Sequence, residues 1–145
     1  MEDLQVYYDM VDGCIRELGV DPAICKGEKP GQWSLKRGSA PVWIDVFYDE
    51  HNKCSYFQVM APVVKVPAVN TQAFYQEVLE IAHNLYGVGF TKFQDWLYVK
   101  AIRETEGLDA SEITATMNRV GFYADQYDDE LQAKYNAVSG RKSDV

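Results

Sequence analysis

Residues 33–66 constrain the fold more than any other part of the sequence, because their apolar residues alternate. Alternation with a period of two places successive side chains on opposite faces of a β-strand. Two polar turn signals, at residues 37–39 and 49–53, divide this stretch into three runs. The spacing predicts three consecutive antiparallel strands, at residues 33–35, 42–48 and 54–63.

The predicted strands carry two different sets of side chains. One set is aliphatic, as in Val42, Ile44 and Val46, and suits a face packed against helices. A contiguous exposed aromatic patch on the other face would mark an interaction site, whereas scattered single rings need no functional explanation. We interpret the second face as a partner-binding surface, formed by Trp43, Phe47, Tyr56, Met60 and Tyr98.

Helices and a second hairpin surround these strands. Apolar residues at helical spacing predict a helix from about residue 2 to 18 and a second from a cap at Asn70 or Thr71 to Tyr86. A capping-box spacing at Asp109 and Glu112 begins a long last helix, whose apolar stripe is Ile113, Met117, Val120, Ala124, Tyr127, Leu131 and Tyr135.

A hairpin of strands 90–93 and 96–102 turns at Gln94 and Asp95. Pro62 and Pro67 predict that the third strand becomes an edge, a bulge or an exit near its end. The order α-β-β-β-α-β-β-α predicts an α+β fold, a two-layer α/β sandwich with an antiparallel five-stranded sheet and helices mainly on one face.

The second predicted helix has more apolar surface than one buried side requires. Besides a stripe containing Phe74 and Val78, it has a second stripe formed by Tyr75, Leu79, Ala82 and Tyr86. We interpret the second stripe as a homodimer interface, because twofold dimers are the commonest soluble assemblies. Coverage of this stripe by the N-terminal loop is the alternative.

Composition favours a single globular domain and opposes two classes of partner. The chain has 145 residues, of which 47% are hydrophobic and 13% aromatic, and 14 basic against 22 acidic side chains give a net charge of −8. Such a charge repels nucleic acid and anionic lipid, and the only basic group, Lys26, Lys29, Lys36 and Arg37, is small. We expect one domain over residues 1–140, a flexible tail at 141–145, no nucleic acid and no membrane.

Cysteine usage and the N-terminus indicate a cytoplasmic protein. Cys14, Cys25 and Cys54 are odd in number and form no C-x-x-C pair, which is typical of reduced cysteines that serve as small apolar side chains. The N-terminal residues lack the basic and apolar regions of a signal peptide.

No catalytic, cofactor or metal motif is present. The sequence has no G-x-S-x-G or H-E-x-x-H motif, and Lys92 stands where a dinucleotide fingerprint beginning at Gly87 needs its third glycine. We expect His51 and His83 to be surface residues. The acidic residues of the last helix are expected to form a solvated face rather than a metal site: Asp125, Asp128, Asp129 and Glu130. A small-ligand-binding protein or an enzyme with a pocket between sheet and helices remains the alternative.

Several local strings resemble a known family. They are Trp33-Ser34-Leu35, residues 55–59, Phe74-Tyr75, Gly107-Leu108-Asp109 with Glu112-Ile113, and residues 124–128. Together the chain from Leu4 to Val138 resembles YbjN-like domains, which are related in fold to the type III secretion chaperones. The resemblance implies a non-enzymatic, dimeric protein-binding module, chaperone-like or a regulatory adaptor, with no catalytic residues and an unidentified protein partner.

Overall fold

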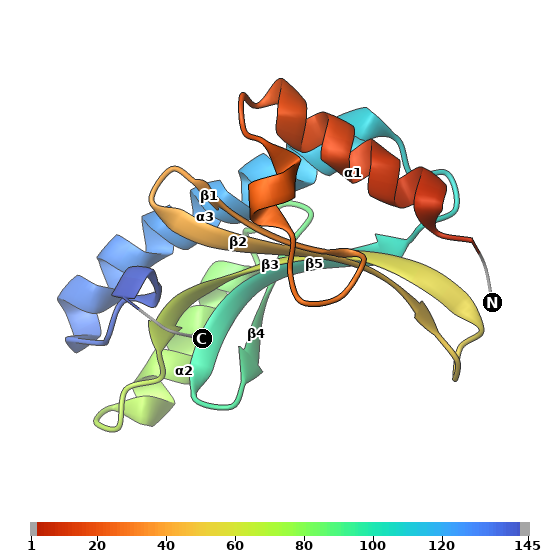
Figure 1. Cartoon of the computed structure of the whole chain (residues 1–145). Coiled ribbons are helices and arrows are strands. Elements are labelled where there is room, and N and C mark those ends of the chain that lie inside the picture. Colours follow the sequence, from red (N-terminus) through yellow and green to blue (C-terminus); the bar gives the residue numbers. More distant parts are fainter. Residues whose placement is uncertain (1–2, 143–145) are drawn as a thin grey trace.

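The computed structural model describes residues 3–142 and shows an arched antiparallel sheet with helices packed along one side (Figure 1). The predicted order α-β-β-β-α-β-β-α and the antiparallel five-stranded sheet are confirmed. Short 3-10 helices, η1 (Pro22–Cys25) and η2 (Gly140–Lys142), supplement these elements. The main elements are α1 (Gln5–Glu17), β1 (Gln32–Arg37), β2 (Ala40–Asp49), β3 (Cys54–Lys65), α2 (Thr71–Ala82), β4 (Gly89–Phe93), β5 (Trp96–Glu104) and α3 (Ala110–Tyr135).

The strands lie in the order β1-β2-β3-β5-β4, so β3 is the central strand. The two predicted hairpins therefore join through a β3–β5 pair rather than through neighbours in sequence. The register of this pair shifts between Pro62 and Val64, which confirms the predicted bulge, whereas the alternative that the strand becomes an edge is wrong because β5 pairs with β3 as far as Lys65. Proline has no amide hydrogen to donate, so the ladder loses a hydrogen bond at this position.

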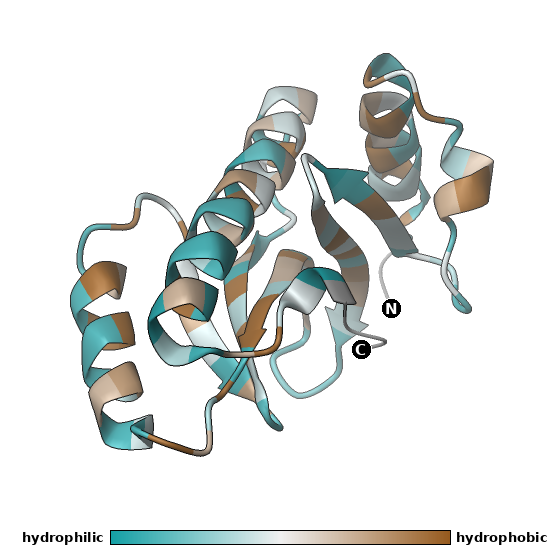
Figure 2. Ribbon diagram, turned by 90° about the vertical axis from the view of Figure 1, so that its left-hand side faces the viewer, coloured by the Kyte–Doolittle hydropathy of each residue, from teal (hydrophilic) through white to brown (hydrophobic). Residues whose placement is uncertain are grey.

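α3 lies against the sheet, with α2 and α1 on either side of it (Figure 2). Asp109 caps its first turn, because its carboxylate accepts a hydrogen bond from the amide of Glu112 at 2.8 Å. Its predicted apolar stripe is confirmed at Ile113, Met117, Val120, Ala124 and Leu131, which are buried, whereas Tyr127 and Tyr135 are half-buried. These side chains meet the aliphatic face of the sheet, which includes Val42, Ile44, Val46, Phe57, Val59, Ala61, Val63 and Val99.

α1 is attached to the sheet mainly through Trp33. The indole nitrogen of Trp33 donates a hydrogen bond to Asp12 at 2.9 Å, and the Tyr8 ring meets the Trp33 ring edge-on at 6.0 Å. Close packing also demands a glycine at position 31, where φ is +85° and a Cβ atom would lie 2.4 Å from the carbonyl oxygen of Val46. The N-terminal helix is thus fixed to the edge of the sheet formed by β1 and β2.

α2 is shorter than predicted, because it ends at Ala82 and not at Tyr86. The amide of Asn84 bonds to the carbonyl of Ile81 at 2.9 Å, which is the tighter pattern of a turn. The amide of Tyr86 then donates to the hydroxyl of Tyr123 on α3 at 3.3 Å. This bond joins segments that are far apart in the sequence. After Ala82 the chain does not follow the helical path predicted from local spacing.

The prediction of a fully solvated acidic face on α3 is wrong for Asp128, which is only 2% exposed. Its carboxylate accepts a hydrogen bond from the Ser139 hydroxyl at 2.6 Å and pairs with Arg141 at 2.8 Å. Burial raises the pKa of Asp128, while the Ser139 hydrogen bond and the Arg141 charge oppose that rise. Asp125 is also engaged, because it accepts hydrogen bonds from the amide and hydroxyl of Ser39.

The C-terminal segment completes the sheet where β2 is absent. Ser139 forms an isolated antiparallel bridge with Val64, and the amide of Lys65 donates to the carbonyl of Val138 at 2.9 Å. Of the tail predicted at residues 141–145, Arg141 and Lys142 belong to η2, whereas residues 143–145 lie outside the described part of the chain.

We expect Arg141→Ala to destabilise the protein, because it leaves the buried Asp128 carboxylate without its cation. Breaking a buried ion pair costs on the order of 3–5 kcal/mol, and the partial exposure of Arg141 lowers our expectation to about 2 kcal/mol. Without Arg141 the pKa of Asp128 rises further, so the loss should be small where this carboxyl is protonated. It should grow as pH rises through the wild-type Asp128 pKa.

Urea denaturation of both proteins near pH 4 and near pH 7 measures this difference. Lys134→Ala is the matched control, because it removes an ion pair between exposed Lys134 and Glu77 and should cost less than about 1 kcal/mol. Equal losses of unfolding free energy in the two variants would contradict a stabilising buried pair of Asp128 with Arg141. So would a loss from Arg141→Ala that is the same at both pH values.

Candidate functional site

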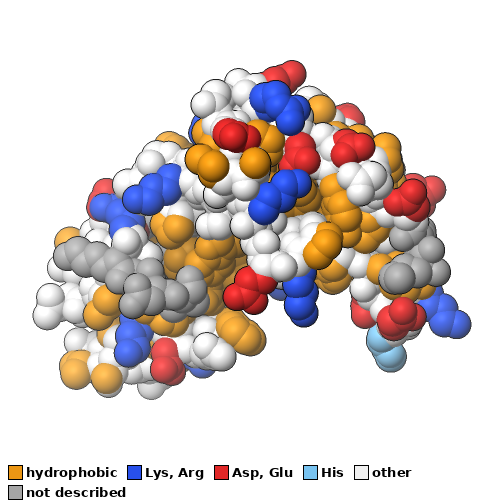
Figure 3. Space-filling model, in the orientation of Figure 1, with side chains coloured by type: hydrophobic (Ala, Val, Ile, Leu, Met, Phe, Trp, Pro, Cys, Tyr) orange, Lys and Arg blue, Asp and Glu red, His pale blue; other side chains and the backbone are white. Residues whose placement is uncertain are grey.

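The sheet face turned away from the helices, called here the open face, follows from the cross-strand register. Trp43 pairs with Met60, Phe47 pairs with Tyr56, and Met60 pairs in turn with Lys100. Directly paired residues share a face, so the five residues predicted to bind a partner lie on the same side of the sheet. The molecule is hollowed beneath the arched sheet, and hydrophobic side chains line part of this hollow (Figure 3).

Two pairs of aromatic rings give the open face its apolar surface. The Trp43 and Tyr98 ring centroids lie 6.0 Å apart, and those of Phe47 and Tyr56 lie 5.8 Å apart. Phe47 is 37% exposed, whereas Trp43, Tyr56 and Met60 are half-buried. Such contacts hold the rings in place while leaving part of their area in water.

Tyr98 lies on the open face but is only 1% exposed, so the expectation of an exposed ring is wrong at this position. Trp43 packs against it, and its register partner on β3 is Pro62. Removal from water raises the pKa of the Tyr98 hydroxyl. Tyr98 therefore supports the Trp43 ring instead of contributing contact area of its own.

The open face also contains apolar residues that the sequence analysis left out. Ile102 is 49% exposed and pairs with Gln58, while Phe93 is 59% exposed at the end of the edge strand β4. Alternation along 96–102 already separated Ile102 from the buried residues. The sequence did not show that β5 pairs with β3. This pairing is what places Ile102 beside the aromatic residues of the open face.

A row of polar side chains crosses the open face between its two aromatic pairs. Cross-strand pairing aligns Gln32 with Asp45 and Asp45 with Gln58. Asp45 is half-buried between Trp43 and Phe47 of its own strand. Burial raises the pKa of its carboxyl, and a hydrogen bond with Gln32 partly opposes this. Along β2 the open face is thus apolar on both sides of the Asp45 carboxylate.

A second exposed apolar surface lies on and just beyond α2. Leu79 is 72% exposed, Tyr75 is 37% exposed and Ala82 is half-buried, and these three lie at helical spacing. Tyr86 is 77% exposed and lies after the end of the helix. We refer to these four residues as the α2 stripe; their role as a dimer interface remains a prediction.

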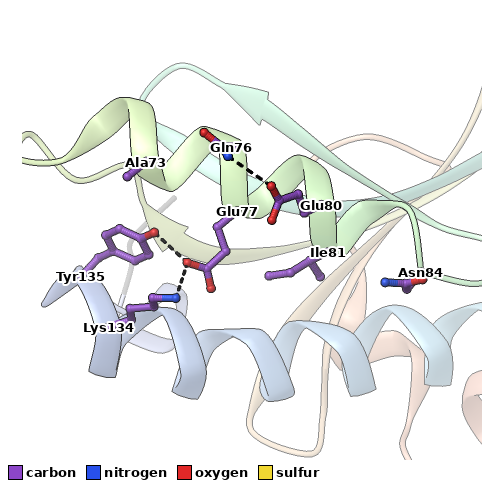
Figure 4. Close-up of a pocket in the computed structure, with 8 residues that line it drawn as sticks. All are labelled: Ala73, Gln76, Glu77, Glu80, Ile81, Asn84, Lys134 and Tyr135. Atoms are coloured by element: carbon purple, nitrogen blue, oxygen red, sulfur yellow. Dashed lines mark hydrogen bonds and ion pairs between the residues drawn. The ribbon is translucent and has the colours of Figure 1, made fainter.

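A groove of about 620 Å³ separates α2 from α3, and five of its polar side chains pair with one another: Gln76, Glu77, Glu80, Lys134 and Tyr135 (Figure 4). Glu77 accepts a hydrogen bond from the Tyr135 hydroxyl at 2.7 Å and pairs with Lys134 at 2.8 Å. The bonds from Lys134 and Tyr135 lower the pKa of Glu77 despite partial burial. Gln76 donates to Glu80 at 3.2 Å. These contacts tie the two helices together.

Between the sheet and the helices there is a small cavity near the core, and a groove of about 660 Å³ lies at the margin between the β1–β2 turn and α3. The cavity between Phe57, Ala101 and Thr116 measures about 130 Å³. Ligand pockets are usually about 300–1,000 Å³, so this cavity is below that range; its residues Ala101 and Thr116 are half-buried and Phe57 is buried. Within residues 3–142, no group of three His, Cys, Asp or Glu side chains is placed to hold a metal ion.

The cysteines behave as packing residues. Cys14 and Cys25 are buried and Cys54 is half-buried, and all three have free thiols. Burial raises the pKa of both the Cys14 and the Cys25 thiol, which disfavours the reactive thiolate. No helix within the described residues is long and apolar enough to cross a membrane.

We expect two aromatic residues of the open face to differ sharply in their effect on stability. Tyr98→Ala should cost about 3–5 kcal/mol, because it removes a buried ring and leaves a cavity. Phe47→Ser should cost less than about 1.5 kcal/mol, because much of this ring already contacts water. Urea denaturation of the two variants measures both values, and similar losses would contradict the described packing.

Comparison with solved structures identifies the same fold elsewhere. A chain in the crystal structure of the ExsC–ExsE complex superposes with a TM-score of 0.68 and 14% sequence identity, over 90% of this chain and 97% of that one. A chain in the structure of the HopA1–SchA chaperone–effector complex gives a TM-score of 0.64 and 12% identity, over 89% of this chain and 99% of that one. At such low identity these likenesses show a shared fold.

Comparison of sequences leads to a family. No curated protein sequence gives a significant match to the chain. A family model does match, over residues 5–142, and thus over the helices, the open face and the Arg141 contacts together. The match agrees with the YbjN-like resemblance of the sequence. The chain belongs to the family described as T3SS (YopN, CesT) and YbjN peptide-binding chaperone 1.

Proposed function

We propose that this chain is a non-enzymatic, chaperone-type protein that holds a segment of a protein partner on its open face. The observation that supports this most directly is the partly exposed apolar surface around Trp43 and Phe47 on a sheet face without a helical cover. The description of the family as peptide-binding chaperones agrees with this function. So does the fold shared with chains found in the ExsC–ExsE and HopA1–SchA complexes.

The physical basis of this proposal is the removal of apolar area from water. Fully burying one large apolar side chain contributes about 1.5–3 kcal/mol, so several such contacts would hold a flexible segment. Phe47, Ile102 and Phe93 each retain more than a third of their accessible area on the open face. The half-buried Trp43, Tyr56 and Met60, with Tyr98 behind them, form the ordered base beneath an incoming segment.

The same proposal includes a homodimer formed through the α2 stripe. Leu79 and Tyr86 are among the most exposed large apolar side chains of the described chain. A surface of this kind on a soluble protein is commonly covered by a second copy. The stripe and the open face belong to different elements, so a dimer could form while each open face stays accessible. We place this dimer in the cytoplasm, in keeping with three free cysteines.

We expect Leu79→Asp to separate the dimer without unfolding the protomer. Leu79 is 72% exposed in the single chain, so the substitution removes little internal packing but places a charge in the proposed interface. Sedimentation velocity at micromolar concentration should give a dimer mass for the wild type and a monomer mass for the variant. Circular dichroism should show unchanged secondary structure.

Phe122→Asp is the matched control, because Phe122 is 63% exposed on α3 and lies outside the stripe. It should leave the mass unchanged. A wild-type protein that sediments as a monomer would remove the dimer from the proposal. A Leu79→Asp variant that keeps the dimer mass would move the interface elsewhere.

We expect a double variant, Trp43→Asp with Phe47→Asp, to lose its protein partner. Two carboxylates on the open face would have to be desolvated on binding, which disfavours an apolar segment. Affinity capture from native lysate, followed by mass spectrometry, compares the partner held by wild type and variant. Ile24→Asp is the control, because Ile24 is 79% exposed on η1, away from the sheet. A partner retained equally by the double variant would count against the open face.

A further inference from the structure

We propose that Asp45 selects a cationic side chain, so that the preferred segment carries a Lys or Arg flanked by large apolar residues. This inference rests on the proposed function and adds a chemical specificity to it. Three observations carry it: the place of Asp45 within the open face, the lack of a cation beside it, and the charge of the whole protein.

The place of Asp45 is fixed by β2. Residues two apart on a strand are separated by about 7 Å and point to the same face, so Asp45 stands midway between Trp43 and Phe47. Cross-strand neighbours repeat this layout, because Gln58 lies between Tyr56 and Met60 on β3. A segment that covers Trp43 and Phe47 along β2 therefore passes over the Asp45 carboxylate.

Asp45 has no cation of its own within residues 3–142. The ion pairs of this part of the chain involve Asp12, Glu77, Glu112 and the α3 carboxylates, and none includes Asp45. Its polar neighbour is the neutral side chain of Gln32. Lys100 shares the open face but belongs to β5, two strands away, at about 10 Å by strand spacing alone.

Covering Asp45 with a purely apolar segment would be costly. A carboxylate removed from water without a cation or sufficient hydrogen bonds loses several kcal/mol of solvation. A Lys or Arg side chain replaces that solvation with a charge-assisted hydrogen bond. An acidic residue at the same place would add repulsion. The same carboxylate thus favours one class of segment and disfavours two others.

The charge of the whole protein acts in the same direction. With 22 acidic against 14 basic side chains, the chain attracts cationic segments and repels acidic ones before contact. Glu104 adds a further acidic residue on the open face, as the register partner of Tyr56. It is exposed at the end of β5, where an approaching cation can keep its own water.

Selection from a random peptide library tests the inference without knowing the natural partner. Phage would display peptides of about 15 residues, long enough to cross the sheet in an extended form. Pools selected on wild type, Asp45→Asn, Asp45→Lys, Glu104→Gln and the Trp43→Asp, Phe47→Asp double variant are sequenced. Circular dichroism confirms that each variant is folded.

In the wild-type pool we expect Lys or Arg flanked by large apolar residues at about three times its frequency in the unselected library. Asp45→Asn should keep the apolar enrichment and lose the cationic one. Asp45→Lys should turn the preference toward Asp and Glu. Glu104→Gln, which removes a carboxylate from the same face, should leave the cationic enrichment in place.

The outcomes separate this inference from the function on which it rests. A wild-type pool rich in apolar residues but not in cations would overturn the role of Asp45 and leave the open face as the binding surface. Enrichment of Lys and Arg in the pool selected on Asp45→Asn would also overturn the role of Asp45 and leave the open face as the binding surface. A pool from the double variant that matches the wild-type pool, or a wild-type selection that enriches no peptide, would overturn both.

Discussion

The packing of one long helix across one face of a strongly alternating sheet is the constraint on which this structure depends. α3 has 26 residues and contacts β1, β2, β3 and β5. At about 1.5 Å per residue such a helix is long enough to cross a sheet of this size. Because α3 and its neighbours cover one face, the aliphatic residues of the strands are buried and the alternate residues are left uncovered. The open face is thus a consequence of the way the core is built.

The two exposed apolar surfaces differ in ways that suit different partners. The α2 stripe lies on one helix and the turn after it, without a charged residue among its four members. Such a surface suits a symmetrical contact with an identical copy. The open face is wider and is crossed by a polar row containing Asp45. That combination suits a sequence-selective contact, as proposed above for a partner segment.

The sequence contained enough information to predict the sheet, its faces and the order of its elements. Alternation assigned Val42, Ile44 and Val46 to one face and Trp43 and Phe47 to the other, and the structure agrees. Helix ends and individual exposures were less predictable, because they depend on contacts between distant segments. The amide of Tyr86, for example, bonds to the hydroxyl of Tyr123 on α3, 37 residues further along the chain.

Contacts between distant segments also explain why the predicted exposure of Tyr98 and Asp128 was wrong. Nothing near Tyr98 in the sequence shows that Trp43 will cover it, and nothing near Asp128 shows that Arg141 will pair with it. Asp45 lies two residues from both Trp43 and Phe47 in the sequence, and so on their face, but its polar surroundings depend on Gln32 and Gln58 of the neighbouring strands. Local patterns give the direction of a side chain, whereas its surroundings come from strand pairing and helix docking.

The bridge between Val64 and Ser139 has a consequence for how the molecule is made. β3 is the central strand, yet at its end the partner beside it comes from the far end of the chain, not from β2. During synthesis this end of β3 lacks that partner until Ser139 has been translated. The pairing of β3 is therefore completed late. A fragment that ends before Val138 would leave the end of β3 around Val64 without its partner on that side.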